Sequence, residues 1–179
     1  PGSAFKPIVY AAALENGFSP NSIILDAPFV ERQGVGLKNW KPENYGKKFY
    51  GPTTLRKGIE YSRNLMTIRI AKILGLDKIL NLSKNLNIYD EIPELLSVSL
   101  GSYETTLLNL TSAYATFANE GIYVEPFFIH RIEDKNGVVL ETFSNSPVEV
   151  LSQEKNYIMV NLLKGVINKG SGARLRWKY

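Results

Sequence analysis

The sequence contains no cysteine among its 179 residues. Disulfide bonds, zinc sites built on thiolates and a cysteine nucleophile are therefore excluded. His130 is the only histidine, which disfavours most metal sites and a Ser-His-Asp triad. We therefore expect no metal and no cofactor, and a serine nucleophile would need lysine as its base. The lack of cysteine fits both the cytoplasm and the bacterial periplasm.

Long apolar runs and blocks of one charge are also missing. No run approaches the roughly 18 apolar residues of a membrane span, so any membrane attachment is expected from parts of the protein upstream of this sequence. The chain starts at Pro1 without a signal peptide, which we interpret as an excised piece of something longer. The 21 Lys and Arg residues are spread along the chain and the net charge is only +4, which argues against a nucleic-acid partner.

The composition that remains, 44% hydrophobic and 21% charged, is typical of a globular domain. Apolar periodicity and end signals predict helices over residues 4–15, 53–74 (interrupted at the "YSRN" stretch), 77–88, 105–118 and 152–168. Threonine caps are predicted at the start of "TTLRKGIE", and Ser152 is predicted to cap the last helix. Residues 18–52 are proline-rich and predict irregular structure, with short strands near "SIILDAP". Asn136-Gly137 between β-branched runs predicts a hairpin. The predicted fold is mainly α with a β-hairpin.

Ser3 and Lys6 have the spacing that places two side chains on one face of a helix. Pro7 is tolerated only in a first helical turn, so Ser3 lies at or just before the helix start. Burial and the positive potential of the helix N-terminus both favour a neutral lysine, which could accept the serine proton. An isolated match is more often a capping serine followed by a surface lysine, and Ser152 and Lys155 repeat the same spacing.

Ser62 and Asn64 offer a second hydroxyl and an amide, at a junction between two helical segments. Near the first pair, they could relay a proton to a leaving amine and hold a substrate amide. The pattern alone is weak, because Ser19-Pro20-Asn21 and Ser83-Lys84-Asn85 match it equally well. Order and context favour the Ser62 match.

Four stretches, in the same order, together resemble one known family. They are "PGSAFKP", "GPTTLRKGIEYSRNLMTIRIAKILG", "LGSYETTLLNLTSAYATFANEGIYVEP" and "VINKGSG". They closely resemble the transpeptidase domain of class A penicillin-binding proteins, the bifunctional enzymes that polymerise and cross-link bacterial peptidoglycan. The resemblance implies a penicillin-binding protein/serine β-lactamase-like fold of the α/β sandwich family. Residues 1–179 would be one partial domain, truncated at both ends, with the helical part present and most of the central sheet absent.

The family's motifs are S-x-x-K, S-D-N and K-T-G. By resemblance, Ser3 attacks the carbonyl of a D-Ala-D-Ala stem peptide and Lys6 accepts its proton. Ser62 relays a proton toward the leaving group, and Asn64 binds the substrate amide. β-Lactam antibiotics would acylate the same Ser3. The location implied is the periplasmic side of the bacterial inner membrane.

No Lys-Thr-Gly occurs in the sequence, although that motif follows the "VINKGSG" region in the family. Its lysine binds the substrate carboxylate, and its strand supplies half of the oxyanion hole. We therefore expect little or no transpeptidase activity from the 179 residues alone. A serine β-lactamase, a D,D-carboxypeptidase and a non-catalytic binding domain of the same fold remain alternatives.

Other polar and aromatic residues favour structural interpretations. His130 lies in an apolar strand run, Trp40 in a loop, and Tyr103 with Glu104 after a glycine. The Lys169-Gly170-Ser171-Gly172 stretch lacks the spacing of a phosphate-binding loop and follows a helix instead of preceding one.

Overall fold

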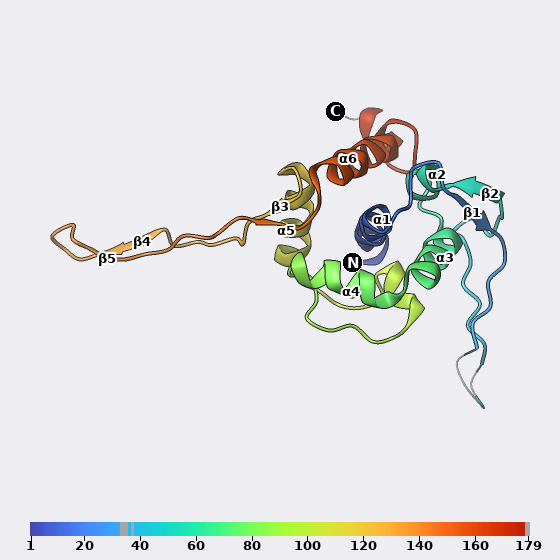
Figure 1. Cartoon of the computed structure of the whole chain (residues 1–179), viewed down its shortest axis with the longest axis horizontal. Coiled ribbons are helices and arrows are strands. Elements are labelled where there is room, and N and C mark those ends of the chain that lie inside the picture. The colour runs from blue at the N-terminus through green and yellow to red at the C-terminus, as the bar shows by residue number, and fades with distance from the viewer. Residues whose placement is uncertain (33–35, 37, 178–179) are drawn as a thin grey trace.

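Helix α1 (Lys6–Glu15) lies at the centre of the molecule (Figure 1). In the computed structural model, which describes residues 1–32, 36 and 38–177, every residue from Lys6 to Leu14 is buried. The sequence KPIVYAAALE is apolar on nearly all sides, as expected of a helix enclosed by other elements. A 3-10 helix, η1 (Gly2–Phe5), leads directly into it.

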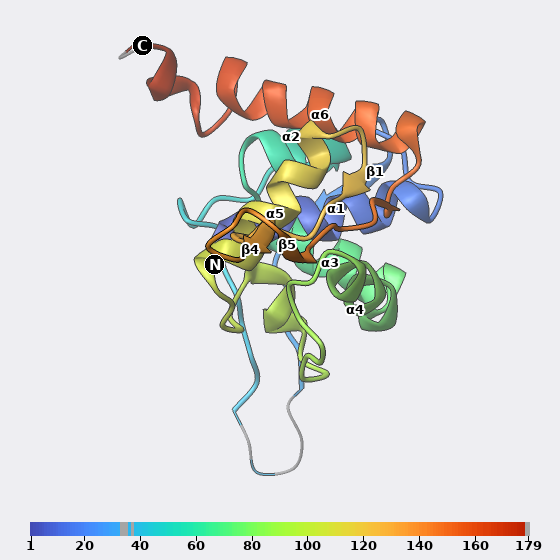
Figure 2. The same cartoon turned by 90° about the vertical axis from the view of Figure 1, so that its left-hand side faces the viewer.

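The other α-helices of the described residues are arranged around α1 (Figures 1 and 2). They are α2 (Leu55–Glu60), α3 (Asn64–Leu74), α4 (Leu76–Asn85), α5 (Leu107–Ala118) and α6 (Gln153–Asn168). Helices α2, α3, α4 and α6 contact α1 directly, and α5 contacts α6. The 3-10 helices η2 (Leu96–Leu100) and η3 (Ala173–Trp177) complete the helical part. No helix among the described residues combines the length and the apolar character needed to cross a bilayer.

The predicted helices are all present, with ends shifted by a few residues. The helix predicted at 77–88 ends at Asn85, because Asn87 adopts a positive φ of 52°. The predicted threonine cap is confirmed, since Thr54 Oγ1 accepts a hydrogen bond from the Lys57 amide. Ser152 occupies the N-cap position of α6, but its hydroxyl donates to Glu15 Oε1 and caps no amide of its helix. The prediction that Ser152 caps by its side chain was therefore wrong.

Strands form three small antiparallel pairs in the described residues. Strand β1 (Ile23–Asp26) pairs with β2 (Gly51–Thr54), β3 (Ile122–Tyr123) with β6 (Val148–Glu149), and β4 (Arg131–Glu133) with β5 (Val139–Thr142). The predicted hairpin is confirmed as β4 and β5, joined through Asn136 and Gly137. Residues 122–149, here called the arm, project from the helical body on the left of Figure 1. The described residues between β1 and β2 project from the opposite side and lie below the body in Figure 2.

Candidate active site

The turn that carries Ser3 is held from both sides. The Gly2 amide donates to Gly101 O at 3.0 Å, and Tyr114 Oη donates to Ala4 O at 2.8 Å. Gly101 has a φ of +75°, and a Cβ atom there would collide with the Gly2 backbone, so this close approach requires glycine. Ser3 itself is exposed. The hydroxyl is therefore accessible on a turn whose backbone is fixed by η2 and α5.

Lys6 is the first residue of α1, and only 2% of its surface is exposed. Its Nζ atom donates hydrogen bonds to Ser62 O at 2.7 Å, Ser62 Oγ at 2.9 Å and Asn64 Oδ1 at 2.6 Å. Among the described residues no carboxylate forms an ion pair with Lys6. The structure thus brings the two predicted motifs into direct contact through this amine.

Burial lowers the pKa of Lys6 from 10.5 to about 8. Removal from water penalises the ammonium form, and no anion offsets that penalty. At pH 7 about one Lys6 side chain in ten is then neutral, against about one in several thousand at the ordinary pKa. Burial is the cause of this lowered pKa, whereas the helix N-terminus was expected to contribute as well.

The three acceptors around Lys6 differ in what they allow after deprotonation. Ser62 O and Asn64 Oδ1 can only accept hydrogen bonds, so they retain the two N–H groups of a neutral amine. The nitrogen lone pair is then left for a hydroxyl, which can reverse and donate. The hydroxyl that bonds to Lys6 is that of Ser62, so neutral Lys6 is arranged as a base for Ser62. Ser3 lines the same cavity, with no direct hydrogen bond to Lys6 among the described residues.

The loop between α2 and α3 places Ser62 and Asn64 against this amine. The Ser62 amide donates to Ile59 O and the Arg63 amide to Gly58 O, which closes the end of α2. Ser62 has a φ of +52°, a left-handed conformation that is of order 1–3 kcal/mol less favourable for a residue with a side chain. Asn64 then begins α3. The surrounding hydrogen bonds hold a strained conformation at the predicted motif.

A cavity of about 360 Å³ joins the predicted residues. Ser3, Lys6 and Ser62 line it, whereas Asn64 contacts Lys6 from outside the lining. The opposite wall is largely apolar and is formed mainly by α6, with Leu163, Val166 and Ile167. A nucleophile candidate, a base candidate and a second hydroxyl therefore share one open cavity next to an apolar surface.

Two further lining residues were missed in the sequence. Ser171 lies in the "VINKGSG" stretch, where no role was predicted for it; its amide donates to Glu60 O at 2.8 Å. Gly170 packs so closely on the Glu60 carbonyl that a Cβ atom would collide with it. Tyr114 lies in the middle of α5 and belongs to no recognisable sequence motif. Only the packing of α2 against α6 brings Ser171 to the cavity.

The competing sequence matches do not reach this cavity. Ser152 bonds to Glu15, at the opposite end of α1 from Lys6. Ser83 is fully buried and donates to Ile79 O within α4, and Ser19 contacts Ser22 in a loop. None of the three lines the cavity with Ser3.

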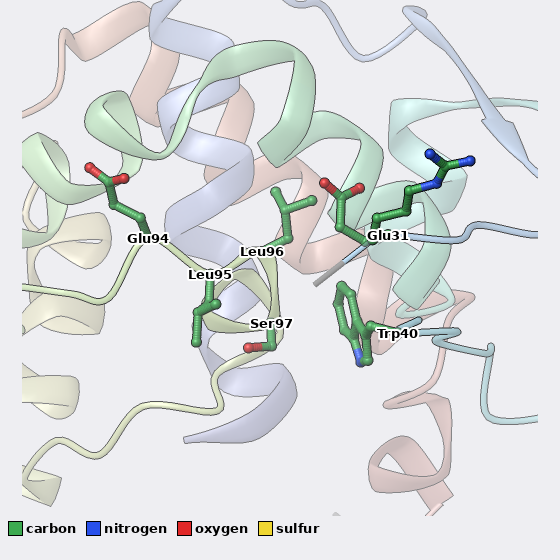
Figure 3. A pocket seen from close by; sticks show the side chains of 7 residues that line it. Glu31, Trp40, Glu94, Leu95, Leu96 and Ser97 are labelled. Carbon is green, nitrogen blue, oxygen red and sulfur yellow. The ribbon is translucent and has the colours of Figure 1, made fainter. Parts of the chain in front are cut away.

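The residues for which structural roles were preferred also lie elsewhere. His130 is exposed, immediately before β4. Tyr103 packs against Tyr89, whose hydroxyl donates to Tyr103 O at 2.6 Å. Trp40 packs edge-on against Phe29 and lines a separate cavity of about 410 Å³. Figure 3 shows Trp40 and Glu31 on one side of that cavity and the chain from Glu94 to Ser97 on the other.

Comparisons with known proteins identify the family of the chain. The family model for the penicillin binding protein transpeptidase domain matches residues 1–178. The chain belongs to this transpeptidase domain family.

Among named relatives, the chain is similar to penicillin-binding protein 1A of several bacteria. It is 40% identical to that protein of Rickettsia conorii, over 96% of this chain and 25% of the relative. The identity is 37% to the Pseudomonas aeruginosa protein, over 87% of this chain and 19% of the relative. The chain therefore spans about a quarter of the length of the curated relatives that it matches.

Solved structures share the fold. The crystal structure of penicillin-binding protein 1A from Haemophilus influenzae matches with a TM-score of 0.89 and 26% identity, over 99% of this chain and 32% of that one. Penicillin-binding protein A from M. tuberculosis, solved as an imipenem acyl-enzyme complex, matches with a TM-score of 0.78 at 21% identity, over 94% of this chain and 43% of that one. The fold is thus the helical part of a penicillin-binding transpeptidase fold, as the resemblance implied.

Proposed function

We propose that this chain is part of a peptidoglycan D,D-transpeptidase domain, in which Ser3 is the acylated nucleophile. The observation that carries the proposal is the placement of Lys6. It is buried, its pKa is lowered to about 8, and it bonds to Ser62 and Asn64 at the cavity that Ser3 lines.

In the proposed reaction, neutral Lys6 takes the Ser3 proton while Ser3 Oγ attacks the carbonyl carbon between the two D-alanines of a stem peptide. The tetrahedral intermediate collapses, the C–N bond breaks, and the terminal D-alanine leaves after its amine receives a proton through Ser62. An ester between Ser3 and the shortened peptide remains. The amine of a second stem then attacks this ester, and its proton returns Ser3 to the hydroxyl form.

Asn64 has two proposed roles. Its carbonyl oxygen keeps Lys6 oriented, and its amide group lies near the backbone amide of the bound peptide. β-Lactams acylate the same Ser3 because their strained amide presents an equivalent carbonyl. Penicillin-binding protein A from M. tuberculosis has been solved as acyl-enzyme complexes with imipenem and with penicillin G.

Peptidoglycan stems lie outside the cytoplasmic membrane, so the proposed location is the periplasmic side of the bacterial inner membrane. Residues 1–179 would form one part of a transpeptidase domain in the longer protein. The sequence has no Lys-Thr-Gly, so it lacks the family's partner for the substrate carboxylate. We therefore expect the 179 residues alone to be acylated slowly, if at all.

The test is labelling with a fluorescent penicillin. The protein expressed from the full coding region that contains this sequence is expected to be labelled, and Ser3→Ala is expected to abolish labelling. Ser152→Ala, which alters the other Ser-x-x-Lys match, is the matched control and is expected to keep it. Labelling that survives Ser3→Ala would overturn the proposed nucleophile, and strong Ser3-dependent labelling of the 179 residues alone would overturn the expected weakness of the short chain.

The same experiment separates the alternatives. A long-lived adduct in the intact mass supports a transpeptidase, whereas rapid hydrolysis of the penicillin would indicate a β-lactamase. Release of D-alanine to water, without cross-linked product, would indicate a carboxypeptidase. A protein that gains no adduct at all would be a non-catalytic domain of the same fold.

A further inference from the structure

Asp26, the last residue of β1, is a buried carboxylate that the proposed reaction does not use. Its side chain is fully buried. Asn44 Nδ2 donates to Oδ1 at 2.7 Å, whereas Oδ2 accepts no hydrogen bond from the described residues and lies 4.0 Å from Arg63 Nε. Burying a carboxylate with so few hydrogen bonds costs free energy, so we asked which contacts of Asp26 offset that cost. Asn44 and Arg63 both connect Asp26 to the segment Ser62–Leu65, where α3 begins.

The first connection runs through the loop that contains Asn44. Asn44 is 3% exposed; it also donates to Lys48 O at 2.9 Å, and its Oδ1 accepts from the Leu65 amide at 3.3 Å. The preceding residue, Glu43, presents its backbone carbonyl to Asn64 Nδ2 at 2.8 Å. A carbonyl can only accept, so it selects the amide nitrogen of Asn64 and turns Asn64 Oδ1 toward Lys6.

The second connection runs through Arg63, the residue between Ser62 and Asn64. Its guanidinium carbon lies 3.5 Å from the centre of the Tyr50 ring, a stacked cation–π arrangement. Its Nε faces Asp26 Oδ2, and 18% of its side chain is exposed. Arg63, in the middle of the motif, is therefore held by Asp26 and by the Tyr50 ring.

We propose that Asp26 is a positioning residue, which acts through Asn44 and Arg63 to hold the segment Ser62–Leu65 so that the carbonyl oxygen of Asn64 faces Lys6. This inference rests on the proposed roles of Ser3 and Lys6. If the Asn64 amide turned over, an N–H group would face Lys6 Nζ. It would repel the ammonium form and compete with the serine hydroxyl for the lone pair of the neutral form.

The substitution Asp26→Asn tests this because it keeps the shape and removes the charge. If the oxygen of the new amide accepts the hydrogen bond from Asn44 Nδ2, its NH2 group faces the Arg63 guanidinium. That group cannot attract the guanidinium as the carboxylate does. We expect the second-order rate constant for acylation by fluorescent penicillin to fall about tenfold to a hundredfold, the effect of a small misplacement at a reacting centre. The experiment uses the protein from the full coding region. Asp90→Asn, at an exposed aspartate, is the matched control and is expected to change nothing.

The pH dependence of acylation distinguishes positioning from a purely structural role, because lost stability alone would not change it. The groups that meet Lys6 Nζ are Ser62 O, Ser62 Oγ and Asn64 Oδ1. Loss of the Asn64 acceptor disfavours the ammonium, so in Asp26→Asn we expect the inflection of the rate profile to move below its wild-type position. A lower amount of labelled protein with an unchanged inflection would indicate lost stability alone and would overturn the inference.

A second measurement does not depend on activity. Asn44 Oδ1 accepts from the Leu65 amide, so Asp26→Asn is expected to reduce hydrogen-exchange protection of Leu65 while α1 stays protected. If wild-type protein is not acylated at Ser3, the proposed function fails, and Leu65 protection still decides the positioning. Unchanged Leu65 protection in Asp26→Asn would overturn it.

Should Asp26→Asn fail to fold, Arg63→Gln replaces it, because this side chain is partly exposed and its loss spares the buried carboxylate–amide contact. We expect a smaller fall in acylation, about threefold, because the Arg63–Asp26 contact is long, at 4.0 Å, and the connection through Asn44 remains. The inflection is expected to move in the same direction as for Asp26→Asn. An unchanged rate and profile in Arg63→Gln would contradict the second connection and overturn the inference.

Discussion

Helix α1 and the arm are both rich in apolar residues, yet their surroundings are opposite. Every side chain of α1 from Lys6 to Leu14 is buried. In the arm, Phe128 is 90% exposed and Leu140 is 66% exposed. The helix is enclosed by elements from the whole length of the chain, whereas the arm contacts the body only where it leaves and returns.

This difference shows two ways of defining a local structure. In the arm, neighbouring residues suffice: Asp134 Oδ1 accepts from the Asn136 and Val138 amides, and these backbone N–H groups lower the pKa of Asp134. At α1, the chemistry of Lys6 depends on burial by distant segments. The following changes test that contrast, from the largest expected effect to the smallest.

Lys6→Met removes the amine and keeps a long apolar stem. In the protein from the full coding region we expect acylation of Ser3 to slow about a thousandfold, because a positioned general base contributes roughly 10²–10⁴ in rate. Lys155→Met, at the second Ser-x-x-Lys, is the control and is expected to retain the wild-type rate. A Lys6→Met rate within tenfold of wild type would show that Lys6 is not the base.

Leu14→Ala and Leu140→Ala delete the same atoms from the two regions. Leu14 is completely buried, so we expect its loss to lower the free energy of unfolding by about 3 kcal/mol. Leu140 is mostly exposed, and its loss is expected to change that free energy by less than about 0.5 kcal/mol. Native-state hydrogen exchange at the α1 amides measures both. Equal effects would mean that the arm is as well covered as the core.

The pH dependence tests the consequence of burying Lys6. With its pKa at about 8, the acylation rate is expected to rise about tenfold between pH 7 and pH 9 as the neutral amine accumulates. Because the folded pKa lies below the unfolded one, the folded state binds fewer protons between them. The free energy of unfolding should therefore rise between pH 8 and 10.5, by up to about 3 kcal/mol, with no contribution from Lys6 to its pH dependence below that range.

Two controls belong to that measurement. Lys6→Met is expected to remove the stability increase, since no titrating amine remains. A wild-type acylation profile that is flat from pH 7 to pH 9 would contradict the lowered pKa.

Gly137→Ala tests the local definition of the arm. Gly137 has a φ of +81°, where a side chain is strained by roughly 1 kcal/mol. We expect faster amide exchange in β4 and β5 and no change at α1. Gly46→Ala, which has an ordinary φ and open space around it, is the matched control. A change of more than about 0.5 kcal/mol at α1 would show that the arm and the core unfold together.

Much of the secondary structure could be predicted because its signals are local. The apolar period of α3, α5 and α6, the Thr54 cap and the Asn136-Gly137 turn each lie within a few residues. The 3-10 helix η2 was missed, since five residues carry no period that distinguishes them from a loop. The aspartate in the apolar run "SIILDAP" was a signal for a buried polar site, but nothing nearby identified its partners.

The candidate site shows the same division. Ser3, Lys6, Ser62 and Asn64 came from short motifs and from the resemblance over the whole chain. Asn44, Ser171 and the roles of their hydrogen bonds could not be predicted, because their partners are separated by 18 to 111 residues or lie across helix contacts. Such contacts depend on how helices pack, which no local pattern encodes.

The two Ser-x-x-Lys matches show which properties follow from the sequence and which from the tertiary structure. By itself the sequence determined that Ser3 and Ser152 each precede a helix and that a lysine follows on the same face. Only the tertiary structure decided that Lys6, and not Lys155, is enclosed by Ser62 and Asn64 with almost no exposed surface. The physical reason is that burial lowers the pKa of Lys6 toward neutral pH, and distant parts of the chain supply that burial.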